Sequence, residues 1–183
     1  VKMKNRICIP PMVIGFSNDG SVAPENVERY KKLAQGGAGL IIQEATCVNS
    51  DGKLSEHQLG IWADDQIEGL KSIVDVVHEE NCPIFIQIHH AGVVGISENP
   101  ICPSSYEYKN HVRTVVGREM TIEDIKSIQN DYVEAARRAY EAGYDGIELH
   151  GCHGYLISQF LDKKVNKRTD EYGTNPEKFV IEI

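Results

Sequence analysis

The sequence lacks both the long apolar run and the positive charge that mark several protein classes. No uninterrupted apolar stretch approaches the roughly 20 residues that span a bilayer. No apolar segment follows the charged residues of 1–6, so we expect no signal peptide. A formal net charge of −8 opposes binding to nucleic acids and to anionic membranes, which both require a positive protein surface. We therefore expect no nucleic-acid partner and no membrane partner.

The cysteines are not arranged as a disulfide framework or as a cluster site. The chain has five cysteines, which are Cys8, Cys47, Cys82, Cys102 and Cys152. They are odd in number, lie far apart and include no C-x-x-C pair. This spacing indicates neither structural disulfides nor a cysteine-rich zinc or iron–sulfur site. Cys8 and Cys82 lie in or beside apolar segments, where we expect them to be buried. A reducing, cytoplasmic setting fits this pattern.

What the sequence does contain is a repeated order of helix, helix stop, short apolar strand and polar residue. We expect a first strand over 7–9, which ends at Pro10 and Pro11. The repeats follow, with helices over 24–35, 65–80 and 122–142 and strands over 38–42, 83–86 and 144–149. In the last of these helices apolar residues recur at spacings of three and four, which predicts one apolar face.

The expected helix ends have physical causes. Thr121, followed by Glu123 and Asp124, can accept hydrogen bonds from the free amides of a helix start and place negative charge there. Asp65 with Glu68 has the same pattern. Residues that tolerate the left-handed conformation should end the helices, and these are Gly36, Asn81 and Gly143.

Alternating strands and helices predict an α/β fold with a parallel sheet, either a barrel or a doubly wound open sheet. No G-x-G-x-x-G follows the first strand, which removes the main support for a dinucleotide-binding open sheet. Polar residues gather at the expected strand ends, over 43–44, 87–90 and 150–153, and that face carries the chemistry of a TIM barrel. We therefore predict a TIM (β/α)8 barrel, of which residues 1–183 supply about the first four βα units as one partial domain. A further helix should begin at 175–177, and the sequence stops inside it.

The segment 91–120 shows no clear periodicity. A loop of this length in a compact domain is usually functional, so we expect a lid or a binding excursion. Its side chains Tyr106, Tyr108 and His111 either contact a substrate or are ordinary loop residues.

His150, His153 and Tyr155 are the strongest candidates for chemistry, because they cluster after one strand among glycines. Two histidines three positions apart can converge on one acceptor or on one metal ion, and the tyrosine offers a phenolic proton. The alternative is a pair of core histidines whose ring nitrogens are satisfied. A metal site would lack the carboxylate or third histidine of H-E-x-x-H sites, so we predict no metal ligands.

Several motifs, in their order along the chain, resemble those of the Old Yellow Enzyme family of flavin reductases. They are 5–7 with Pro11-Met12, then 36–45, 87–92, 142–150, 153–156 and 159–161, and finally Asn166 with 168–173. The match extends over nearly the whole chain, and several motifs in order are more specific than any one. The resemblance implies a TIM-barrel enzyme that uses NAD(P)H and FMN to reduce the C=C bond of α,β-unsaturated carbonyl compounds.

The resemblance also implies roles for individual residues. FMN would lie across the barrel mouth against the residues that follow the first two strands, which are Pro10, Pro11, Met12, Val13 and Ala45. Gln87 would hydrogen-bond the pyrimidine edge of the flavin, because its amide both donates and accepts. His150 and His153 would bind the carbonyl oxygen of the enone substrate and stabilise the charge that develops there. Tyr155 would supply the proton to the α-carbon.

Two positions depart from the family pattern. Val13 stands where many relatives carry a cysteine or threonine that hydrogen-bonds the flavin, so that contact is missing. Val93 replaces the arginine that commonly follows His90-Ala91-Gly92. Neither position belongs to the set of His150, His153 and Tyr155.

Other interpretations also fit the residues. One is a metal-dependent TIM-barrel lyase or hydrolase that uses His150 and His153 as ligands. Another is an inactive half-barrel that self-associates, because a sheet of four strands leaves two edges unpaired. We expect a homo-oligomer or self-association through such edges, and no activity from these 183 residues alone. The charged segment 168–172 is expected to fix a turn by hydrogen bonds rather than to form a charged site.

Overall fold

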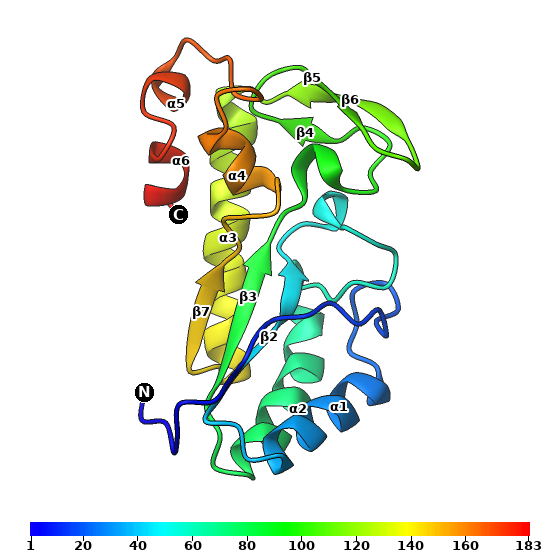
Figure 1. Cartoon of the computed structure of the whole chain (residues 1–183), viewed down its shortest axis with the longest axis vertical. Coiled ribbons are helices and arrows are strands. Elements are labelled where there is room, and N and C mark those ends of the chain that lie inside the picture. The colour runs from blue at the N-terminus through cyan, green and yellow to red at the C-terminus, as the bar shows by residue number, and fades with distance from the viewer.

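A parallel sheet forms the centre of the computed structural model, which describes residues 1–183 (Figure 1). Its strand order is β1-β2-β3-β7, with β1 at Cys8–Ile9, β2 at Leu40–Cys47, β3 at Ile84–His89 and β7 at Gly146–Leu149. The crossover helices are α1 (Pro24–Gln35), α2 (Ile67–His78) and α3 (Ile122–Ala142). Figure 1 shows α3 running behind β3 and β7, and α2 packs against both α1 and α3. The predicted parallel α/β arrangement is confirmed.

The core lies between these helices and the sheet. The apolar face of α3 is buried through Ile125, Ile128, Tyr132, Ala135 and Ala139. It meets the buried β3 side chains Ile84, Ile86 and Ile88 within one cluster. Full burial of one such isoleucine side chain stabilises the fold by about 1.5–3 kcal/mol. The periodicity of the sequence therefore predicts the packed face of α3 correctly, apart from Ile122, which is 39% exposed.

The ends of the helices follow the expected chemistry in part. The Thr121 hydroxyl accepts a hydrogen bond from Asp124 N at 3.1 Å, and the Asp124 carboxylate accepts one from Thr121 N at 2.8 Å. This capping box confirms the predicted start of α3. The expected start at Asp65 is wrong, because a 3-10 turn over Asp64–Gln66 precedes α2 and the Gln66 side chain accepts from Ala63 N.

The predicted helix stops at Asn81 (φ 51°) and Gly143 (φ 92°) adopt the left-handed conformation. Gly36 does not, since its φ is −67° and Gly37 takes the positive angle of 88° instead. The stop after α1 is therefore displaced by one residue.

The second strand is longer than expected. Gln43 and Glu44 lie buried inside β2 rather than at its end, and the register against β3 shifts between Gln43 and Thr46. The prediction of a buried Cys8 is also wrong, because β1 is a two-residue edge strand and this thiol is exposed. Cys82 is buried as expected.

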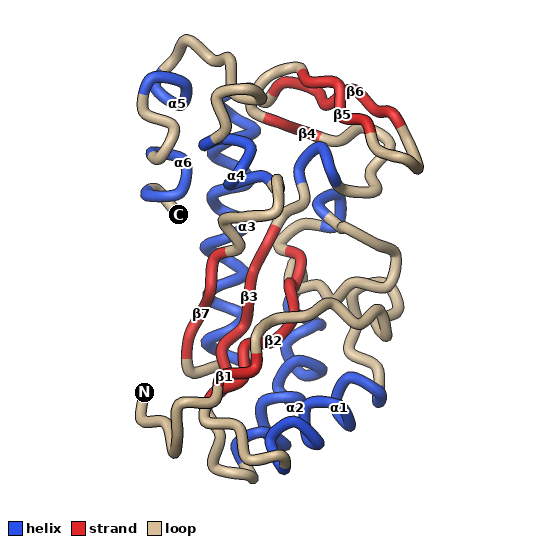
Figure 2. Tube along the Cα trace, in the orientation of Figure 1, coloured by secondary structure: helices blue, strands red, loops and turns tan.

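The segment between β3 and α3 is not a plain loop. It contains a second sheet of order β4-β6-β5, formed by β4 (Ile101–Cys102), β5 (Tyr106–Lys109) and β6 (Thr114–Glu119). Figure 2 shows this sheet set apart from the central one, above the carboxyl ends of β2 and β3. The sequence predicts a binding excursion between β3 and α3 but not the strands within it. These strands have two to six residues of mixed polarity, which is too short for apolar and polar residues to alternate recognisably.

The last part of the chain adds three short helices, α4 (Leu156–Leu161), α5 (Glu171–Thr174) and α6 (Lys178–Ile181). The stacked rings of Phe160 and Phe179, with centroids 4.0 Å apart, join α4 to α6. The Arg168 guanidinium donates to the carbonyls of Pro103 and Met120 and pairs with Asp170. This confirms the expected structural role of 168–172. No helix has the length and apolar character to cross a membrane.

Candidate active site

A tight turn after β7 brings the predicted histidines together. His150 is buried, and its backbone N–H donates to Ile88 O at 3.1 Å, which continues the pairing with β3. His153 and Gly154 then take positive φ angles of 59° and 74°, and Leu156 N donates to His90 O at 3.0 Å. As a result His150 Nε2 and His153 Nδ1 lie 3.4 Å apart. Both rings thus present nitrogen atoms to one point at the carboxyl end of the sheet.

Tyr155 lies against the same rings. Its ring centroid is 4.9 Å from that of His150 and 6.1 Å from that of His153. It is also 4.9 Å from His89. Burial raises the pKa of the Tyr155 phenol, and the nearby Cys152 and Tyr108 raise it further. The phenol therefore keeps its proton at neutral pH.

The buried histidines of the site, His150 and His89, are uncharged at neutral pH. Burial, and then the charge of His153, lower the pKa of His150, while Glu148 opposes the shift. Burial also holds the pKa of His89 well below its usual range, with His90 and His150 adding to the effect. Both ring nitrogens of His89 are buried without a hydrogen-bond partner. A neutral imidazole carries one N–H, so His150 can donate one hydrogen bond while its other nitrogen accepts.

Cys152 is a member of this cluster that sequence analysis did not identify. Its Sγ lies 3.6 Å from His150 Nδ1 and 3.5 Å from His153 Nδ1, and its side chain is exposed. The sequence places it between the histidines, but only the turn at His153 shows that all three side chains converge.

The residues after β1 are anchored to β2 by a buried carboxylate. Ile14 N donates to Glu44 Oε2 at 3.0 Å, and the Tyr30 hydroxyl donates to Glu44 Oε1 at 3.3 Å. Burial raises the pKa of Glu44, and these hydrogen bonds oppose the shift. The segment thus held contains Pro10 and Met12, which are exposed, and Pro11 and Val13, which are half-buried. Ala45 is only 4% exposed, so it offers a small part of its surface to a ligand.

Gln87 is paired with a residue of the neighbouring strand. It lies in register with Glu148 across β3 and β7, and its Nε2 donates to Glu148 Oε1. Alternation along β3 places Gln87 on the same sheet face as Phe85, opposite Ile84 and Ile86 of the helix-packed core. Gln87 Oε1 is therefore the amide atom that is left to accept from a ligand.

The excursion contributes to the surroundings of His153. A hollow of about 190 Å³ is lined by ten residues, among them His153, Tyr106, Tyr108, Val93 and Gln159. The two tyrosines thus face the same space as His153, whereas His111 is not among the lining residues.

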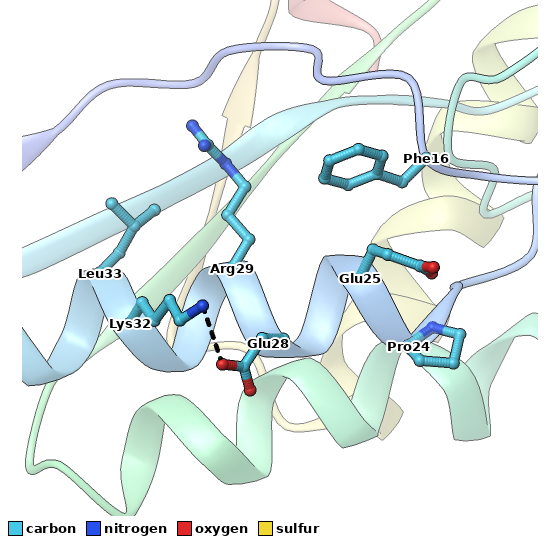
Figure 3. Close-up of a pocket in the computed structure, with 7 residues that line it drawn as sticks. All are labelled: Phe16, Pro24, Glu25, Glu28, Arg29, Lys32 and Leu33. Carbon is cyan, nitrogen blue, oxygen red and sulfur yellow. Dashed lines mark ion pairs between the residues drawn. The ribbon is translucent and has the colours of Figure 1, made fainter.

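A larger hollow lies elsewhere on the surface. It has a volume of about 540 Å³ and is formed by Phe16 and the outer side of α1 (Figure 3). Figure 3 shows Glu28 paired with Lys32 among the lining residues, and Arg29 directed away from this pair. None of the predicted site residues lines this hollow.

The family model described as the NADH:flavin oxidoreductase / NADH oxidase family matches residues 1–183. The chain belongs to this family. It is 42% identical over 187 aligned residues to an NADPH dehydrogenase of Bacillus subtilis, covering 99% of the chain and 55% of that protein. It is 44% identical over 180 residues to an NADPH dehydrogenase of Geobacillus thermodenitrificans, covering 96% of the chain and 52% of that protein. The chain therefore spans about half the length of these relatives.

Solved structures show the same relationship in three dimensions. Morphinone reductase superimposes with a TM-score of 0.90 at 30% identity, over 98% of this chain and 54% of that one. The Old Yellow Enzyme homologue from Zymomonas mobilis gives 0.88 at 31% identity, over 100% of this chain and 56% of that one. The fold is thus that of the amino-terminal portion of the TIM barrels of Old Yellow Enzymes, which confirms both the predicted family and the fold class.

Proposed function

We propose that the complete protein is an FMN-dependent oxidoreductase that uses NAD(P)H to reduce the C=C bond of α,β-unsaturated carbonyl compounds. The observation that carries this proposal is the convergence of His150 Nε2 and His153 Nδ1, 3.4 Å apart, beside the Tyr155 ring. Relatives that are named as NADPH dehydrogenases support the nicotinamide reductant. One solved relative, a morphinone reductase, was determined with tetrahydroNAD.

The residues near the carboxyl ends of β1 to β3 fit a flavin ring. Met12 exposes 62% of its surface, and the half-buried Pro11 and Val13 beside it extend an apolar area against which a flat ring can lie. Gln87 is 6% exposed, and its free Oε1 suits a ring N–H donor. We assign the flavin contacts to these groups together with Pro10 and Ala45. FMN would supply the hydride to the substrate.

His150 and His153 would bind the carbonyl oxygen of the substrate. Each would donate one N–H once the substrate oxygen replaces the hydrogen bond between the two rings, and neither donation requires a charged imidazole. Their donation strengthens as negative charge develops on that oxygen, so it lowers the barrier to hydride addition at the β-carbon.

Tyr155 would then donate its phenolic proton to the α-carbon. Its raised pKa suits this role, because the group remains protonated until the carbanion-like centre forms. Solvent would return the proton to the phenolate. Tyr106 and Tyr108, which share the hollow beside His153, would contact the distal part of the substrate.

We also propose that residues 1–183 form part of one FMN-binding barrel domain and that the protein acts in the cytoplasm. The 183 residues alone should be inactive, because the phosphate site of this fold usually forms from the loops after strands seven and eight. The alternative of a metal-dependent lyase or hydrolase is not supported by the family to which the chain belongs, because that family consists of flavin oxidoreductases.

The test uses the complete protein reconstituted with FMN and supplied with NADPH and 2-cyclohexenone. We expect NADPH oxidation that depends on the enone and yields the saturated ketone in equal amount. A protein that retains FMN but forms no saturated ketone from any enone tested would contradict the proposed function.

A further inference from the structure

We propose that His150, Cys152 and His153 form a binding site for a thiophilic transition-metal ion, represented by Zn²⁺. Two imidazoles and one thiolate are a ligand set that Zn²⁺ accepts in proteins, with the fourth position open to water or another ligand. One ligand atom from each of the three residues lies within 4.8 Å of the other two. The site needs no side chain beyond these three.

The spacing of the donor atoms is close to that of a tetrahedral zinc site. Zn–N bonds of about 2.0–2.1 Å and Zn–S bonds of about 2.3 Å place two nitrogens about 3.4 Å apart and a nitrogen about 3.6 Å from sulfur. The observed His150 Nε2–His153 Nδ1 distance is 3.4 Å. Cys152 Sγ lies 3.5 Å from His153 Nδ1 and 3.6 Å from His150 Nδ1. His150 would bind the ion through one nitrogen only, either Nε2 beside His153 or Nδ1 beside Cys152, and one ligand atom from each of the three residues lies within 4.8 Å of the other two.

The site is both accessible and held in place. Cys152 and His153 are exposed, so an ion can enter from solvent, whereas His150 is 6% exposed and fixed at the end of β7. The turn is tied to β3 by the His150 N–Ile88 O bond and to the segment after β3 by the Leu156 N–His90 O bond. Binding would form one Zn–S bond and release the Cys152 thiol proton to solvent.

Occupation of this site would block the role that the proposed function gives to the histidines. A nitrogen that coordinates Zn²⁺ cannot donate a hydrogen bond to a substrate carbonyl. We therefore expect Zn²⁺ to inhibit enone reduction competitively, a consequence that rests on the proposed function. Metal binding itself does not depend on that function.

The direct test is titration of the full chain with Co²⁺, whose absorption reports both tetrahedral geometry and thiolate ligation. We expect a thiolate-to-cobalt band that is displaced by Zn²⁺. The Cys152→Ser variant should lose the band and weaken Zn²⁺ binding at least about tenfold, since even outer-shell partners of a metal ligand contribute that much. Cys8→Ser is the matched control, because Cys8 is the other exposed thiol, and it should leave both signals unchanged. His153→Ala should weaken Zn²⁺ binding as well.

The absence of a thiolate band in the wild-type chain, or a band that persists in Cys152→Ser, would overturn the proposal. Steady-state kinetics of enone reduction distinguishes a failure of the metal-site proposal from a failure of the proposed function. Zn²⁺ should raise the apparent KM for the enone in the wild-type holoenzyme and raise it less in Cys152→Ser. Co²⁺ binding in a protein that reduces no enone would refute the proposed function and leave the metal site standing.

Discussion

Gln87 donates its amide hydrogen to Glu148, the residue directly beside it on the neighbouring strand. The carboxylate can only accept, so it fixes which end of the amide is free. Oε1 then remains as the amide atom that can accept a hydrogen bond from a flavin N–H. We therefore propose that Glu148 is a positioning residue for Gln87.

We predict that Gln87→Ala weakens FMN binding to the complete protein about three- to tenfold. A hydrogen bond contributes about 0.5–1.5 kcal/mol, and each 1.4 kcal/mol corresponds to about a factor of ten. Titration followed by flavin fluorescence measures the Kd. Gln35→Ala, at an exposed position of α1, is the matched control. An unchanged Kd in Gln87→Ala would remove Gln87 from the cofactor site.

We predict that His150→Ala and His153→Ala weaken the binding of phenolic or enone ligands and leave FMN bound. Removal of one donor to a developing oxyanion costs on the order of 10² in rate, so kcat for enone reduction should fall by that order. Ligand-induced changes in the flavin spectrum give the affinities. His111→Ala is the control, since His111 is exposed and does not line the hollow beside His153. Wild-type ligand affinity in both variants would contradict the assignment.

We predict that the chain loses stability as the pH falls from about 6.5 toward 4, in part because of His90. Burial lowers the pKa of His90 to about 4. In the unfolded chain the same group titrates near 6.5. The unfolded state therefore binds the proton first, and the contribution of neutral His90, about 3 kcal/mol, is present above pH 6.5 and lost on acidification. Buried His89 adds an effect of the same sign.

Urea unfolding at pH 7 and at pH 4.5 measures this loss. His90→Asn keeps an acceptor for Gly92 N, which donates to His90 Nδ1 at 3.0 Å, but carries no titrating group. Its stability should depend less on pH than that of the wild type, whereas the exposed control His57→Asn should match the wild type. Equal slopes in all three proteins would show that His90 is not the titrating group.

We predict that the 183-residue chain self-associates at concentrations above micromolar. The strands β1 and β7 stand at the two ends of the sheet, and Ile147 in β7 and Ile7 just before β1 are 39% and 61% exposed. Unpaired strand edges recruit other chains, and a charged residue at an edge opposes this. Light scattering should therefore report a dimer or larger assembly, and Ile147→Lys should reduce its mass. A monodisperse monomer of the unaltered chain would count against open-edge pairing.

Local signals in the sequence predict the helices better than the strands and the site contacts. The bounds of α1 and α3 are those expected, because a proline start, a capping box and apolar periodicity all lie within the segment itself. The Gln87–Glu148 pair joins residues 61 positions apart, so it depends on a strand register that no local pattern encodes. Cys152 meets the histidines in a turn where His153 adopts a positive φ, which its sequence neighbours do not predict.

The measurement that tests the account most directly is a stopped-flow comparison of the two half-reactions in Tyr155→Phe and the wild-type holoenzyme. In the proposed mechanism, reduction of the bound flavin by NADPH needs no proton from Tyr155, whereas reoxidation by an enone does. We expect the variant to reduce its flavin at close to the wild-type rate and to react with the enone about 10²–10⁴-fold more slowly, the range that general acid catalysis contributes. Equal slowing of both half-reactions, or no slowing of either, would contradict the proton-donor role of Tyr155 and the proposed chemistry of this site.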